Sequence, residues 1–104
     1  MKLSIQKIKT LQHFFADKPV FNVYLFGSYA RGDAGRNSDI DLLIHFDFES
    51  MPTGIEYFDM WGQLEKLMKK KIDFVSSRKL SSRVKEEVER DKILIYEKDL
   101  KETN

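Results

Sequence analysis

A glycine–serine pair and an Asp-x-Asp motif are separated by ten residues, and each adjoins a short apolar run. The pair at 27–28 follows the run Val20–Phe26, and Asp39 and Asp41 open the run 39–46. Both runs are rich in β-branched, leucine or aromatic residues, which is typical of buried strands. If the two strands are antiparallel, the end of the first lies beside the start of the second, so the two motifs meet.

Helical and strand patterns alternate along the rest of the chain. Apolar residues at helical spacing predict helices over 4–16, 55–70 and 82–90, with one helical turn over 29–31. Strands are predicted over 20–26, 39–46, 71–76 and 93–96. We expect a loop over 51–54 and a polar tail over 98–104. No repeat or linker divides the sequence, so we predict one domain over 1–104 with its motifs in a core of about 20–97.

Charge and cysteine content exclude several classes of site. Eighteen basic and seventeen acidic residues give a net charge of +1, whereas proteins that grip nucleic acid usually carry a clear basic excess. Direct nucleic-acid binding is therefore not expected. The absence of cysteine excludes disulfides, thiolate zinc sites and a cysteine nucleophile. No apolar run has the length of a membrane span or a signal peptide, so we expect a soluble cytoplasmic protein.

Three acidic residues lie in apolar surroundings. Asp39 and Asp41 project from the same face of one strand, and Asp73 lies within the apolar strand 71–76. Neighbouring carboxylates in a partly buried place repel each other and destabilise the fold. A divalent cation reverses the sign of that energy, and oxygen ligands suit Mg²⁺. Three acids could hold two such ions about 4 Å apart, as in phosphoryl or nucleotidyl transfer.

The glycine–serine pair complements these acids. Gly27 lets the backbone approach a phosphate closely, and Ser28 offers a hydroxyl and an N–H to phosphate oxygens. Arg31 is a candidate to steady the triphosphate, and a surface salt bridge to Asp33 is the alternative. Each residue also has a plainer interpretation, since an Asp-x-Asp pair can be solvated and a glycine–serine pair is often only a turn. For Asp73 the alternative is an edge-strand residue that faces water.

These segments resemble the minimal nucleotidyltransferases, the small MNT branch of the DNA polymerase β superfamily. The resemblance rests on Gly-Ser-Tyr-Ala-Arg-Gly-Asp at 27–33 and on Ser-Asp-Ile-Asp-Leu-Leu-Ile at 38–44. The strand 71–75 is similar to the strand that carries the family's third acid, and 89–97 resembles its usual ending. The similarity extends over about 20–96. It implies an α+β nucleotidyltransferase fold, a small mixed sheet flanked by helices.

The resemblance also implies roles for the site residues. Asp39 and Asp41 would ligate two Mg²⁺ ions, and Asp73 would complete one metal site and favour deprotonation of the attacking hydroxyl. Gly27 and Ser28 would hold the β and γ phosphates of ATP. Family members are often paired with a HEPN-domain RNase, which the MNT protein neutralises as an antitoxin. In some pairs the antitoxin transfers AMP from ATP to a tyrosine of the HEPN protein.

Three functions are therefore open. The first is Mg²⁺-dependent transfer of AMP to a partner protein in a hetero-oligomer with a HEPN-domain protein. The second is a non-catalytic antitoxin that binds nucleotide and neutralises its partner by occlusion, for which the aromatic helix around 57–61 offers a surface. The third is nucleotidyl transfer to a small molecule. For Tyr57, Phe58, Trp61 and Met68 we expect burial in the core.

Overall fold

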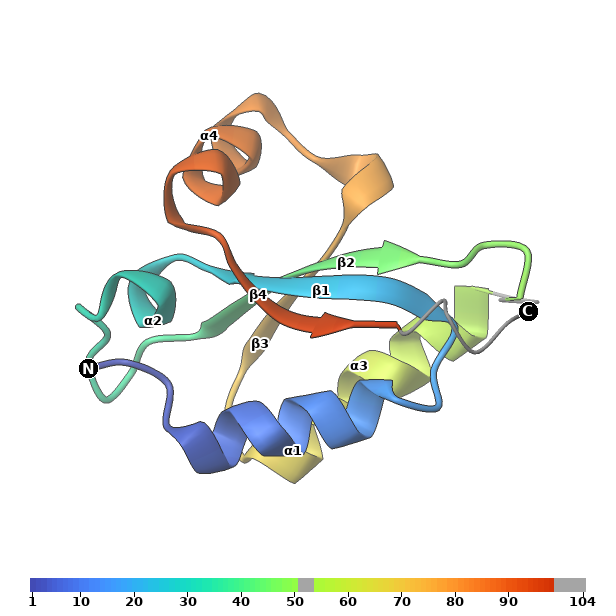
Figure 1. Ribbon diagram of the computed structural model, residues 1–104, viewed down its shortest axis with the longest axis horizontal. Coiled ribbons are helices and arrows are strands. Elements are labelled where there is room, and N and C mark those ends of the chain that lie inside the picture. Colours follow the sequence, from blue (N-terminus) through green and yellow to red (C-terminus); the bar gives the residue numbers. More distant parts are fainter. Residues whose placement is uncertain (51–53, 99–104) are drawn as a thin grey trace.

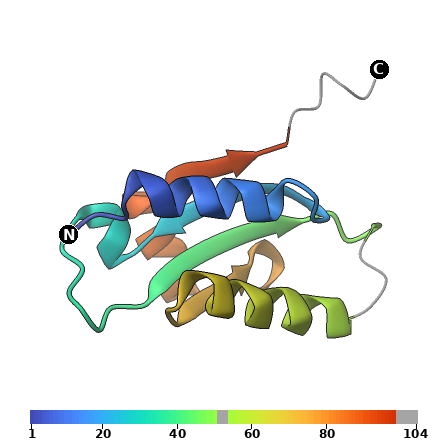
Figure 2. The same cartoon turned by 90° about the horizontal axis from the view of Figure 1, so that it is seen from below.

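The computed structural model describes residues 1–50 and 54–98. In this part of the chain a four-stranded sheet in the order β3-β2-β1-β4 forms the middle layer. Helices α1 and α3 cover one face of the sheet and α4 covers the other (Figures 1 and 2). The elements are α1 (Ile5–Phe15), β1 (Val20–Phe26), α2 (Ser28–Arg31), β2 (Ile40–Phe46), α3 (Gly54–Met68), β3 (Ile72–Ser76), a 3-10 turn (Ser77–Lys79), α4 (Ser82–Asp91) and β4 (Ile93–Glu97).

The predicted α+β fold is confirmed, and each predicted helix and strand is present. Ser4 and Ser81 accept hydrogen bonds from backbone N–H groups of the following turn, so they begin α1 and α4 as N-caps. The 3-10 turn after β3 was not predicted, because three residues carry no periodicity. The expected loop at 51–53 and most of the expected polar tail lie outside the described residues. No helix within the described ranges is long and apolar enough to cross a membrane.

Strand pairing brings the predicted motifs together. β1 is antiparallel to both β2 and β4, and β2 is parallel to β3. Phe26, the last residue of β1, lies opposite Asp41 of β2. Asp41 in turn lies opposite Asp73 of β3. The antiparallel arrangement on which the sequence argument depended is therefore present, and the third acid comes to the same place.

Alternation along the strands gives the sheet two apolar faces. The larger core lies between the sheet and helices α1 and α3, and its fully buried side chains include Leu11, Phe15, Val23, Ile40, Leu42, Ile44 and Leu64. A smaller cluster on the other face contains Phe26, Leu43 and Val88 under α4. Because side chains alternate across a strand, Asp41 shares the α4 face with Leu43. The acids therefore stand beside the smaller cluster.

Helix α3 covers the free edge of β3 with polar side-chain atoms. The Tyr57 hydroxyl donates to the carbonyl of Phe74 (2.6 Å), and Trp61 Nε1 donates to the carbonyl of Ile72 (2.8 Å). Glu65 Oε2 accepts from the N–H of Ile72 at 2.9 Å. Edge strands otherwise present unpaired backbone groups to other chains, and these bonds remove that hazard on β3.

The expected burial of the α3 aromatics is correct for three residues and wrong for one. Tyr57 and Trp61 are half-buried against the core and Met68 is buried. Phe58 is 67% exposed, because it stands on the outer side of the helix with Ile55. Helical spacing alone did not separate these positions, since Phe58 is adjacent in sequence to a core-facing tyrosine.

We predict that Tyr57→Phe lowers the free energy of unfolding by about 1 kcal/mol, because the Phe74 carbonyl loses its donor while the ring stays in place. Chemical denaturation followed by circular dichroism measures this change. Ile55→Ala is the control, since Ile55 is 73% exposed and its truncation should change stability by less than about 0.5 kcal/mol. Equal stability of Tyr57→Phe and the wild type would show that this hydrogen bond contributes nothing.

Candidate active site

A tight turn connects β1 to β2 and begins with the glycine–serine pair. Gly27 has φ +74°, and the short helix α2 starts at the next residue, Ser28. The carbonyl of Gly27 accepts from the N–H groups of Ala30 and Arg31 at 3.1 and 3.0 Å. The first N–H groups of a helical turn have no partner within it, so they are available to an anion. The predicted helical turn is confirmed, although it starts one residue earlier than expected.

Gly27 lies directly against Asp41. A Cβ added at Gly27 would collide with Oδ2 of the Asp41 carboxylate, and the positive φ of Gly27 is one that side-chain-bearing residues rarely adopt. Two independent constraints therefore require glycine here. The close approach also means that the turn and the first of the strand acids form one site.

The three predicted acids lie on the α4 side of the sheet. Asp39 is exposed and immediately precedes β2, whereas Asp41 is half-buried within it. Asp73 lies on the edge strand β3 and is exposed, as the alternative interpretation expected. It nevertheless faces another acid, because it is in register with Asp41. The structure therefore brings Asp41, Asp73 and Gly27 together, with Asp39 two residues before Asp41.

Burial and mutual repulsion change the ionisation of the central pair. Burial raises the pKa of Asp41 to about 7, and the charges of Asp73 and Asp39 add to this rise. Burial of the carboxyl group also raises the pKa of Asp73, and the charge of Asp39 adds to this rise. The two acids titrate as a coupled pair, because burial and mutual repulsion disfavour the state in which both are charged.

Glu87 of α4 is a fourth acid whose position the sequence did not reveal. Its charge contributes to the raised pKa of both Asp41 and Asp73, so it faces the site from the helix above the sheet. Val84 and Val88 of the same helix pack on the smaller core cluster. The spacing of these valines is the signal that could have placed Glu87 on the inner side of α4.

Arg31 forms ion pairs with two carboxylates. Its Nε donates to Asp33 at 3.1 Å, which is the salt bridge that the sequence left open. Its Nη1 donates to Asp91 at 2.7 Å. The Asp91 side chain is 3% exposed and also accepts from Arg90, and together these arginines hold its pKa below the usual value. Arg31 thus ties α2 to the end of α4, a link that sequence reasoning did not find.

The donor set suits a hard divalent cation. All four acids offer oxygen ligands, and burial and mutual repulsion raise the pKa of both Asp41 and Asp73. A bound cation would relieve that repulsion. As they stand, no three acidic or imidazole side chains in the described residues are grouped closely enough to hold a metal ion. The pair Asp41 and Asp73 is therefore the part of the predicted metal site already assembled.

Comparisons with known proteins show the family of this chain. The family model "Polymerase beta, Nucleotidyltransferase" matches residues 9–101. The chain belongs to this family. It is a minimal nucleotidyltransferase. The chain is 33% identical over 76 residues to "Protein adenylyltransferase MntA" of Thermococcus cleftensis, and the match covers 73% of this chain and 75% of that protein. It is also 38% identical over 78 residues to "Putative protein adenylyltransferase MJ1379" of Methanocaldococcus jannaschii, across 74% of this chain and 76% of that one.

Solved structures share the fold of this nucleotidyltransferase. One described as "Structure of putative minimal nucleotidyltransferase" is 34% identical with a TM-score of 0.69, and the match covers 85% of this chain and 88% of that chain. A toxin–antitoxin structure with AMP-PNP has a TM-score of 0.72 at 22% identity and covers 91% of this chain and 76% of that one. A third structure is a tri-AMPylated Shewanella oneidensis HEPN toxin in complex with an MNT antitoxin. Its TM-score is 0.59 at 20% identity, and the match covers 94% of this chain and 72% of that one.

We predict that Gly27→Ala destabilises this nucleotidyltransferase by about 1–3 kcal/mol, because the new methyl group collides with Asp41 at a strained φ. Gly62→Ala is the matched control. Its added Cβ meets nothing within 4 Å, so it should stabilise α3 by about 0.5–1 kcal/mol. Urea unfolding of both variants measures the difference. Unchanged stability of Gly27→Ala would contradict the close packing of the turn against Asp41.

We predict that Asp41 destabilises the metal-free protein increasingly as the pH rises from about 4 to 7. The pKa of Asp41 is raised from 3.8 to about 7 in the folded state, so the stability of the protonated form is present at low pH and is lost through this window. Asp41→Asn should therefore exceed the wild type in stability at pH 8 by about 1–2 kcal/mol, a figure discounted for solvent exposure.

Thermal melts in EDTA at pH 5 and pH 8 measure this effect. The advantage of Asp41→Asn should be several degrees at pH 8 and smaller at pH 5. Asp59→Asn, an exposed acid of α3, is the control measured at each pH. If Asp41→Asn is no more stable than the wild type at pH 8, then Asp41 and Asp73 do not repel each other as described.

Proposed function

We propose that this chain is a Mg²⁺-dependent protein adenylyltransferase that transfers AMP from ATP to a hydroxyl group of a partner protein. The observation that carries the proposal is the in-register pair Asp41 and Asp73 beside the turn at Gly27. Its family membership and its relatives that are named protein adenylyltransferases support the reaction type. ATP is favoured because one structure of the same fold was obtained with AMP-PNP.

Each residue of the site has a role in this reaction. Asp39 and Asp41 would hold two Mg²⁺ ions and Asp73 would complete one site. The ions would neutralise charge on the triphosphate and make the attacking hydroxyl more acidic. Gly27 and Ser28 would bind the β and γ phosphates through backbone N–H groups and the serine hydroxyl.

The transfer itself is an in-line displacement at the α-phosphorus. The hydroxyl oxygen of the target forms a bond to this phosphorus, and the bond from the phosphorus to the oxygen that bridges to the β phosphate breaks. Pyrophosphate leaves with that electron pair. Asp73 would accept the proton from the hydroxyl, because its carboxylate lies in register with Asp41 at the proposed metal site.

Arg31 has a place in this scheme that differs from direct phosphate binding. Its guanidinium is engaged by Asp33 and by the buried Asp91. In this role it would hold α2, and with it Ser28, at a set distance from α4. The direct contact between Arg31 and the triphosphate stays a prediction.

The proposed target is a HEPN-type RNase toxin, so that the chain acts as an antitoxin. The AMPylated HEPN toxin bound to an MNT protein of the same fold supports this choice. The alternative is neutralisation by occlusion without catalysis. It is favoured by the apolar side chains of Ile55 and Phe58, which are exposed on the outer side of α3 and could contact a partner.

We predict that the wild type, Mg²⁺ and α-labelled ATP label a protein partner, and that Asp41→Asn abolishes labelling while the complex with the partner still forms. Asp17→Asn is the matched control, since Asp17 is an exposed acid that pairs with Lys18 after α1. Labelled bands on gels, followed by mass spectrometry of the labelled peptide, give the readout.

The same variants separate the catalytic and occluding mechanisms. Loss of neutralisation in Asp41→Asn with an intact complex supports catalysis. If Asp41→Asn neutralises the partner as well as the wild type does, the protein acts by binding. If labelling by the wild type is absent while the folded protein and its partner are present, then the adenylyltransferase proposal is wrong.

A further inference from the structure

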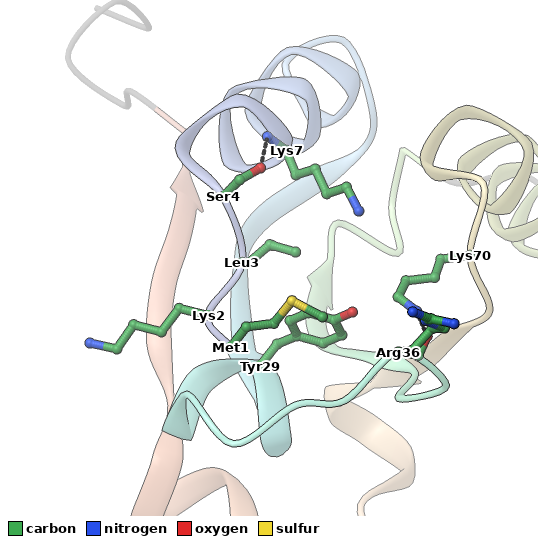
Figure 3. Close-up of a pocket in the computed structure, with 8 residues that line it drawn as sticks. All are labelled: Met1, Lys2, Leu3, Ser4, Lys7, Tyr29, Arg36 and Lys70. Atoms are coloured by element: carbon green, nitrogen blue, oxygen red, sulfur yellow. Dashed lines mark hydrogen bonds between the residues drawn. The ribbon is translucent and has the colours of Figure 1, made fainter.

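A pocket of about 330 Å³ lies on the side of the sheet opposite the acids, between the start of α1, the turn α2 and the end of α3. Figure 3 shows its lining. Lys7, Arg36 and Lys70 extend toward the space that the Tyr29 hydroxyl also faces, whereas the amine of Lys2 points away from it. Three cationic groups and a phenol therefore converge from separate parts of the chain.

The lining of this pocket contains basic residues and no acidic ones. Two other pockets of the protein, of about 480 and 180 Å³, both contain Lys18 together with Glu56 and a further aspartate. Within residues 1–50 and 54–98, the described salt bridges involve none of the basic residues of the first pocket. Their mutual repulsion is therefore not compensated by a neighbouring carboxylate.

One of these cations, Lys70, is held in place by contacts across the pocket. Lys70 Nζ donates to the carbonyl of Arg36 at 2.9 Å, so it bridges the end of α3 to the loop before β2. The same ammonium lies 5.6 Å from the centre of the Tyr29 ring, and the ring is buried. Ser4, the N-cap of α1, also lines the pocket, and the positive end of that helix adds to the field.

We propose that this pocket binds a phosphate-bearing small molecule, at a site distinct from the candidate active site. Ammonium groups, a guanidinium and a phenol are donors that match the several oxygens of a phosphate or polyphosphate. The volume is at the lower end of small-molecule sites, so the pocket suits a compact anion. A strand of nucleic acid would extend well beyond this volume, so we favour a compact anion as the occupant.

The bound anion would contact both sides of the turn that leads into the candidate active site. Tyr29 follows Ser28 directly, and Arg36 is three residues before Asp39. The acids nevertheless face α4, whereas Tyr29 belongs to the core under α1 and α3. Binding at the pocket is therefore separable from binding at the acids.

The test uses Asp41→Asn protein in EDTA, which removes metal-dependent binding at the acids. Inorganic phosphate and pyrophosphate are titrated in turn and followed by ¹⁵N-resolved NMR. We expect saturable shifts at the amides of Tyr29, Arg36 and Lys70. Lys7→Gln and Arg36→Gln are then added together to this protein. We expect them to raise the dissociation constant at least about tenfold.

The control carries Lys9→Gln on α1 and Lys66→Gln on α3. It removes as many positive charges as the test variant does but leaves the pocket lining intact. Its dissociation constant should stay within about twofold of the parent. Equal weakening by both double variants, or shifts confined to Ser28 and Asp73, would overturn the proposal. So would tighter binding of a short single-stranded RNA at the same amides. The assay contains no ATP, metal or partner, so its failure leaves the proposed transfer reaction untouched.

Discussion

The repulsion between Asp41 and Asp73 is the constraint around which this structure is built. Parallel pairing of β2 with β3 places the two carboxyls in register on a partly buried face, where burial and the neighbouring charge raise the pKa of Asp41. The apolar residues on the opposite face of β2 enforce this arrangement. A shift by one residue would turn Ile40, Leu42 and Ile44 toward α4 and the acids into the main core. Core packing thus holds two like charges together.

The remaining parts of the site are attached to this pair by specific contacts. Gly27 allows the turn after β1 to approach Asp41, where any side chain would collide. Arg31 binds the buried Asp91 and so joins α2 to α4, which also carries Glu87 toward the acids. The site is therefore assembled from residues spread over 27–91, although its glycine–serine and Asp-x-Asp motifs occupy only 27–41.

A cluster of acids and a basic pocket lie on opposite faces of the sheet. The acids lie on the α4 side, and the basic pocket lies on the side of α1 and α3. The net charge of +1 reveals neither cluster, because it sums charges over the whole chain. In both clusters the fold holds like charges together, and such an arrangement favours a bound counter-ion. The acids favour a cation, and the basic pocket favours an anion.

The sequence by itself determined the main helices and strands and, given antiparallel pairing, the meeting of Gly27 with the strand acids. These features depend on the spacing of apolar residues along the chain, on the positive φ that glycine allows and on the antiparallel pairing of successive strands. The tertiary structure alone decided that Asp73 is in register with Asp41, that Asp91 holds Arg31, and that Phe58 is exposed while Trp61 covers the edge of β3. These partners are distant in sequence or differ only in their rotation about a helix, and packing of the core, rather than local periodicity, brings such groups together.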